Sequence, residues 1–202
     1  VIHEPGHTEE EKDHMENSDA KTAAFKTGVS IVEDWGYFGV SFKNIENVYG
    51  IPFHGEHEET PAANGAAAHD DEERIESSTD SDTINLKGSY NIAGDFINQI
   101  DYFYSDTDYN LVEAHIGGEH NGEKTTFLND AQEFGGILDL SNDALTQKIV
   151  IRSMEEDTSI LGEEAFMENV ESEETSYGYY LNKQFSSFDL DFGIRRDEVN
   201  RK

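Results

Sequence analysis

The sequence predicts an all-β protein, an antiparallel up-and-down meander of about eight strands. The first observation is that apolar and polar residues alternate, as in residues 83–92, where Ile84 and Leu86 flank Asn85. Successive side chains of a strand point to opposite faces, so this alternation indicates strands with one apolar and one polar face. The second observation is that short, turn-forming segments alternate with long polar segments, which is the pattern of strands joined consecutively.

Each predicted strand has this alternation and is bounded by a turn-forming or polar segment. The strands are expected over residues 23–32, 37–45, 83–92, 96–104, 125–138, 145–154, 175–185 and 188–195. The short turns are 34–36, 93–95, 141–143 and 186–187, and the long segments are about 1–20, 47–80, 107–124 and 156–173.

The sorting of short and long connections points to part of a larger transmembrane β-barrel. In an up-and-down meander every second connection lies at the same end, and outer-membrane barrels have short turns at one end and long loops at the other. A soluble β-sandwich is the alternative. In the barrel interpretation one row faces lipid, namely Ile84, Leu86, Tyr90, Ile92, Phe188, Leu190, Phe192 and Ile194. The complementary row faces the lumen, namely Thr83, Asn85, Lys87, Asp189 and Asp191.

Composition narrows the classes of function. The chain has 44 Asp and Glu against 14 Lys and Arg, for a net charge of −30. Such a surface repels phosphate backbones and concentrates cations, so we expect a cationic ligand and no nucleic acid. The absence of cysteine excludes a disulfide framework, and no apolar run is long enough for a transmembrane helix. The start at Val1 without a leader, and the end just after a strand, suggest a fragment.

The chain has no recognisable catalytic or cofactor-binding motif. Neither a glycine-rich phosphate loop nor a G-x-S-x-G nucleophile elbow is present, so no enzyme activity and no cofactor are expected. The spacing HEPGH at residues 3–7 matches the H-E-x-x-H pattern of zinc proteases. Pro5 and Gly6 oppose the helix that this chemistry needs, so we interpret the match as coincidence.

The eight histidines are predicted to lie in the long loops and in none of the strands, with the densest group, HGEHEE, at residues 54–59 and HDDEE at 69–73. Imidazole nitrogens combined with carboxylate oxygens suit Zn²⁺, whereas Ca²⁺ would need only oxygens. A solvated acidic loop with chance histidines is the alternative. The candidate metal ligands are His54, Glu56, His57, Glu58, Glu59, His69, Asp70 and Asp71.

Two segments resemble zinc-uptake TonB-dependent receptors of the bacterial outer membrane. The more specific one is residues 17–59, where a GVS strand leads into YGIP and then into the histidine and acidic loop. The other is ILGEEAF at 160–166 with the strands that follow, and TTFLND at 125–130 lies between the two. The resemblance covers most of residues 17–202. It implies metal ligands only where the loop matches the family, at His54, His57 and the acidic residues beside them. His69, Asp70 and Asp71 are added on their chemistry alone.

The resemblance implies a barrel of about twenty-two strands around a plug domain, with zinc import driven by the TonB complex. The chain would be a partial barrel domain over 1–202, with a metal-capturing extracellular loop at 47–80. Its implied partners are zinc, outer-membrane lipid and, through a plug that the sequence lacks, the TonB complex. The alternatives are a TonB-dependent receptor for a metal chelate, siderophore or haem, and a soluble secreted β-domain that binds calcium.

Overall fold

A computed structural model describes residues 17–52, 74–92, 94, 96–118, 120–162 and 165–202. In this part of the chain all regular structure is β-strand, and no helix is long and apolar enough to cross a bilayer. The eight strands are β1 (Ala20–Glu33), β2 (Gly36–Ile51), β3 (Arg74–Asn91), β4 (Gln99–Ile116), β5 (Lys124–Asp139), β6 (Thr146–Gly162), β7 (Val170–Gln184) and β8 (Asp189–Arg201).

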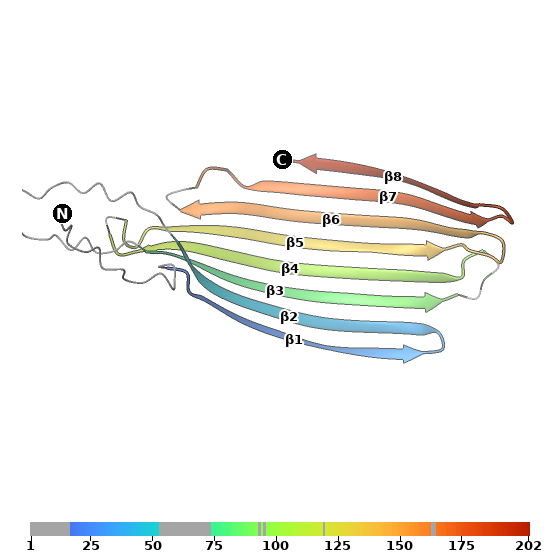
Figure 1. Cartoon of the computed structure of the whole chain (residues 1–202), viewed down its shortest axis with the longest axis horizontal. Coiled ribbons are helices and arrows are strands. Elements are labelled where there is room, and N and C mark those ends of the chain that lie inside the picture. Colours follow the sequence, from blue (N-terminus) through green and yellow to red (C-terminus); the bar gives the residue numbers. More distant parts are fainter. Residues whose placement is uncertain (1–16, 53–73, 93, 95, 119, 163–164) are drawn as a thin grey trace, which may run out of the picture.

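The strands form one sheet in chain order, and every neighbouring pair is antiparallel (Figure 1). This confirms the predicted meander, and the described strands do not divide into the two packed sheets of a sandwich. The connections after β1, β3, β5 and β7 lie at one end, which we call the turn end. Those after β2, β4 and β6 lie at the other end, which we call the loop end.

The strands extend further toward the loop end than the sequence predicted. β4 continues to Ile116, and β6 continues to Gly162. The connections there are therefore 52–73, 117–123 and 163–169, in place of the longer segments expected at 47–80, 107–124 and 156–173. Toward this end the strands carry polar or acidic residues on both faces, as in Ser77 to Asp82, and they lose the alternation on which the prediction rested.

Register assigns every side chain to one of two faces, because directly opposed residues in antiparallel strands point to the same side. Through the five strand pairs from β3 to β8, Ile84 and Tyr90 of β3 share a face with Leu190 and Ile194 of β8. Asn85 and Asp191 lie on the other face, as the sequence predicted. We call these the apolar face and the polar face.

The apolar face carries two bands along the strands. Nearest the turn end is an apolar band formed by Val29, Ile31, Phe38, Val40, Phe42, Ile84, Leu86, Tyr90, Ile100, Tyr102, Tyr104, Phe134, Leu138, Ile149, Ile151, Tyr177, Tyr179, Leu181, Leu190, Phe192 and Ile194. Next toward the loop end is an acidic band formed by Glu46, Asp80, Asp82, Asp106, Asp108, Asp130, Glu155, Asp157, Glu171 and Glu173. Beyond this band, the strand ends carry Val48, Val112, Ile116, Leu128 and Leu161 on the same face.

The described sheet has almost no buried core. Ile160 is its single buried apolar side chain, whereas large apolar side chains such as Ile194 and Val29 are 61% and 68% exposed. A soluble domain would cover such a face with a second layer, because burial of apolar surface is the main driving force of folding. No described segment covers this one.

Candidate binding site

All eight candidate metal ligands fall in residues 53–73 and lie outside the described residues. The structure therefore neither brings together nor separates His54, Glu56, His57, Glu58, Glu59, His69, Asp70 and Asp71. Within the described residues, no group of three or more His, Asp and Glu side chains is arranged to hold a metal ion. What the structure does describe is the base from which this segment leaves the sheet.

The two ends of the segment leave from neighbouring strands that are held together. Ile51, the last residue of β2, is opposite Ile75 of β3. The side-chain amide of Asn17 donates to the carbonyl oxygens of Ile51 at 2.6 Å and Ile75 at 3.1 Å, so one side chain bridges both strands. Asn17 has a φ of 54°, in the left-handed region that asparagine tolerates better than most residues. Gly50 makes room for it, because a Cβ there would collide with the Asn17 side chain.

An exposed cluster of ion pairs stabilises the same base of the segment, at the ends of β2 and β3. The guanidinium of Arg74 contacts Asp19 at 2.9 Å and Glu76 at 3.3 Å. The hydrogen bond from Arg74 lowers the pKa of the Asp19 carboxyl below its ordinary value, and the bond to Asp19 in turn raises the pKa of Arg74. The cluster places the positive charge of Arg74 among carboxylates immediately beside the 53–73 segment.

His115 departs from the sequence prediction, which placed every histidine in a loop. It lies in β4, directly opposite Ile75, because β4 runs one residue beyond it. Its ring meets that of His120 edge to face with 5.8 Å between centroids, and Nδ1 of His120 is 3.0 Å from the Glu123 carboxylate. The end of β4 and the connection after it thus bring two histidines and a carboxylate together, and the register places His115 opposite Ile75, at the base of the 53–73 segment.

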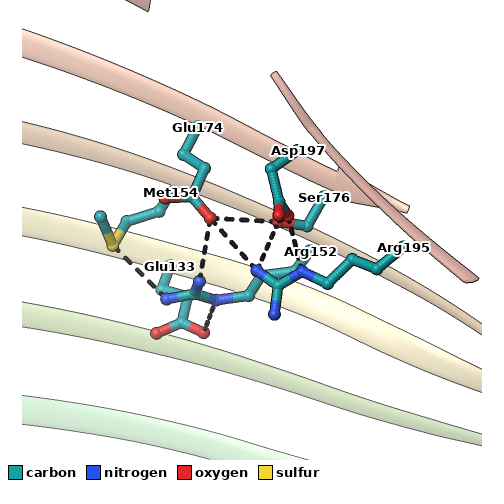
Figure 2. Close-up of polar contacts among 7 residues, drawn as sticks. All are labelled: Glu133, Arg152, Met154, Glu174, Ser176, Arg195 and Asp197. Carbon is teal, nitrogen blue, oxygen red and sulfur yellow. Dashed lines mark hydrogen bonds and ion pairs between the residues drawn. The ribbon is translucent and has the colours of Figure 1, made fainter. Parts of the chain in front are cut away.

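The polar face carries an ionic network across β5 to β8 (Figure 2). Arg152 pairs with Glu133 at 2.6 Å and with Glu174 at 3.3 Å. Arg195 pairs with Glu174 at 3.5 Å and with Asp197 at 2.6 Å. The hydroxyl of Ser176, a residue only 5% exposed, lies 2.6 Å from the Asp197 carboxylate and 3.1 Å from the Glu174 carboxylate, so the two compete for its one proton. The network ties four strands together on the face that the sequence assigned to polar residues.

The acidic band contains a row of carboxylates that directly oppose one another. Asp82 faces Asp108, Asp108 faces Asp130, Asp130 faces Asp157, and Asp157 faces Glu171. Neighbouring strands are about 4.8 Å apart, and like charges directly opposite destabilise a sheet. Asn44 relieves one end of the row by donating to Asp82 at 2.9 Å and to Asp80 at 3.0 Å.

A scan against protein-family models found no match to this chain, and a search of curated proteins found none either.

Proposed function

We propose that the chain forms part of the wall of an outer-membrane β-barrel receptor of the TonB-dependent type, and that the segment after β2 captures zinc for uptake. The receptor spans the bacterial outer membrane and contacts its lipid. A plug domain outside this sequence would link it to the TonB complex.

The single observation that carries the barrel proposal is the uncovered apolar band on one face of a one-layer sheet. Exposed large apolar side chains of the strands lie mostly on this face, with Val32, Tyr37, Tyr180 and Val199 on the other. In a bilayer the hydrocarbon covers the band, and the antiparallel pairing satisfies the backbone groups that lipid cannot. Aggregation in water is the alternative fate of such a surface.

The strands are longer than a bilayer crossing requires. On β3 the apolar row runs from Ile84 to Tyr90, roughly 20 Å along the strand at about 3.4 Å per residue. At a tilt near 40° this is roughly 16 Å of height, which is less than the about 25 Å of barrel belts. A crossing uses about 9 to 11 residues, whereas β3 has 18. The remaining length carries the acidic band and would stand outside the hydrocarbon.

The zinc proposal is supported by the sequence of the segment and by its place on the sheet. Residues 54–73 contain three histidines and seven carboxylates with no Lys or Arg. The segment begins and ends at the loop end, which in an outer-membrane barrel is the extracellular end.

Site-specific fluorophores and brominated lipid test the lipid-facing assignment directly. The chain contains no cysteine, so a cysteine introduced into it is its single thiol. In the full-length protein reconstituted into vesicles, we expect a fluorophore at Ile84→Cys to be quenched by lipids brominated on their acyl chains. A fluorophore at Asn85→Cys, one residue away on the polar face, should escape quenching.

A third position locates the edge of the hydrocarbon. Asp82→Cys lies on the same face as Ile84 but in the acidic band, and it should be reached by a water-soluble quencher and not by acyl-chain bromine. Equal quenching at Ile84→Cys and Asn85→Cys would contradict the barrel proposal, whatever the outcome of zinc measurements.

A further inference from the structure

We infer that the polar face of β1 to β3 holds a binding site for a multivalent oxyanion, a small molecule that carries several carboxylate or phosphate groups. The site is a shallow hollow of about 380 Å³. Its floor is built from small side chains on two adjacent strands, Gly28 and Ser30 of β1 and Gly39 and Ser41 of β2. Lys26, Lys87 and Asn85 stand around it.

Register explains why the hollow exists. Gly28 is opposite Ser41, and Ser30 is opposite Gly39, so two consecutive rows across the hairpin have almost no side-chain volume. Longer residues lie around these two rows: the next row carries Lys26 opposite Lys43, and Lys87 of β3 is opposite Gly39, beside the hollow. A ligand in the hollow could therefore be reached by Lys26 of β1 and Lys87 of β3. Asn85, Ser30 and Ser41 offer neutral hydrogen-bond donors between them.

The charge of this surface is opposite to that of the whole chain. The polar-face residues of β1, β2 and β3 include three lysines and no Asp or Glu, in a chain of net charge −30. In the described part of the chain, Lys26, Lys43 and Lys87 take part in none of the ion pairs, whereas Arg152 and Arg195 are paired on the same face. Lys26 and Lys43 also oppose each other directly, which is unfavourable unless an anion lies between them.

Citrate and pyrophosphate are suitable probes, because they present the same multiple negative charge on carboxylate and on phosphate groups. We expect isothermal titration of the full-length protein in detergent, at constant ionic strength and without metal, to show saturable binding of at least one of them. The tighter of the two identifies the natural group. Lys26→Gln combined with Lys87→Gln should weaken binding at least tenfold, because charge-assisted hydrogen bonds carry most of the affinity.

A matched control removes two lysines elsewhere, Lys148 beside Asp139 and Lys183 over the ring of Phe185. Lys148→Gln with Lys183→Gln should leave binding unchanged. If the first double variant does not fold, the wild-type protein still tests the site. A bound anion must raise the unfolding midpoint of the wild type above the midpoint measured with chloride at the same total concentration of negative charge. Absence of saturation by both probes, or equal weakening in the two double variants, overturns the inference. No residue of the 53–73 segment enters this site, so the result is independent of zinc capture.

Discussion

The ring of Tyr102 on β4 lies over the backbone of Gly88 on β3, directly opposite it, and a Cβ at Gly88 would collide with the tyrosine ring and hydroxyl. The next residue repeats the arrangement on the other face. Phe103 lies over Gly135 of β5, where a Cβ would be 2.7 Å from Cζ of the ring. Two consecutive aromatic residues thus cover glycines on both neighbouring strands, and they fix the register at the centre of the sheet.

Gly88→Ala should destabilise the protein by about 1–2 kcal/mol, because the added methyl group forces the Tyr102 ring off its site. Gly193→Ala is the control, since a Cβ at Gly193 meets nothing within 4 Å and its φ is not in the left-handed region. That change should be neutral or slightly stabilising. Urea unfolding in detergent measures both. Truncation to Tyr102→Ala should make Gly88→Ala nearly harmless, and a full penalty in that double variant would disprove the proposed contact.

The ion pair of Glu133 with Arg152 should contribute more to stability than that of Glu198 with Arg196, although both have 2.6 Å between nitrogen and oxygen. The first pair is about one-third exposed on each side and cross-strand, whereas Arg196 and Glu198 are 76% and 55% exposed on one strand. Double-mutant cycles with Gln should give a coupling of about 0.5–1 kcal/mol for the first pair and near zero for the second. Equal coupling energies would show that the ion pair of Glu133 with Arg152 contributes no more to stability than a fully exposed ion pair.

Asp130→Asn should stabilise the sheet by about 0.5 kcal/mol, because Asp130 directly opposes carboxylates on both neighbouring strands, Asp108 and Asp157. The gain should shrink as salt is added, since salt screens exposed charges. Asp143→Asn in the exposed turn after β5 changes the net charge equally and serves as the control. A gain in stability of the same size in Asp143→Asn would show that the gain comes from the lower net charge and not from the row of opposed carboxylates.

The strand alternation was sufficient to predict the meander, the identity of the two faces and the turns, because these depend on residues close in sequence. Strand ends and cross-strand partners were not predicted. The acidic row at Asp82, Asp108 and Asp130 depends on the register of separate hairpins, which the long connections leave undetermined. The opposition of Lys26 and Lys43 could have been predicted from the sequence. Both residues flank the short turn at 34–36 at nearly equal distance, so the pairing of the two strands in a hairpin aligns them.

Arg74→Gln should loosen the base of the 53–73 segment, and its effect should depend on pH. The folded pKa of Asp19 is lowered by Arg74, so the pair stabilises the fold above the unfolded aspartate pKa, near 3.9. That contribution is lost as the pH falls through the lowered folded pKa. Hydrogen exchange of the Gly50 amide, which donates to the Asp19 carbonyl oxygen, should therefore be faster in Arg74→Gln at pH 7. A difference that persisted unchanged below that pKa would exclude the ion pair as its cause.

Zinc binding should weaken as the pH falls through roughly 6, because a histidine must be neutral to ligate and its unperturbed pKa is near 6.5. Binding by carboxylates alone would persist to lower pH. Isothermal titration of the full-length protein measures this directly, and zinc-limited growth reports the same step in cells. Replacing His54 and His57 together by Ala should reduce both, if the residues that resemble the zinc-receptor motif are the ligands.

The matched control replaces His3 and His7 by Ala, which removes the same number of imidazoles from a segment without a matching motif and should change zinc binding far less. His115→Ala is a second control, because the residue lies at the base of the 53–73 segment, opposite Ile75, and not within it. A loss of affinity there as large as in the His54 and His57 variant would move the capture site to the loop end of β4. Identical zinc binding by the His54 and His57 variant and the wild type would exclude the segment as the capture site and leave the barrel assignment to be judged by lipid quenching alone.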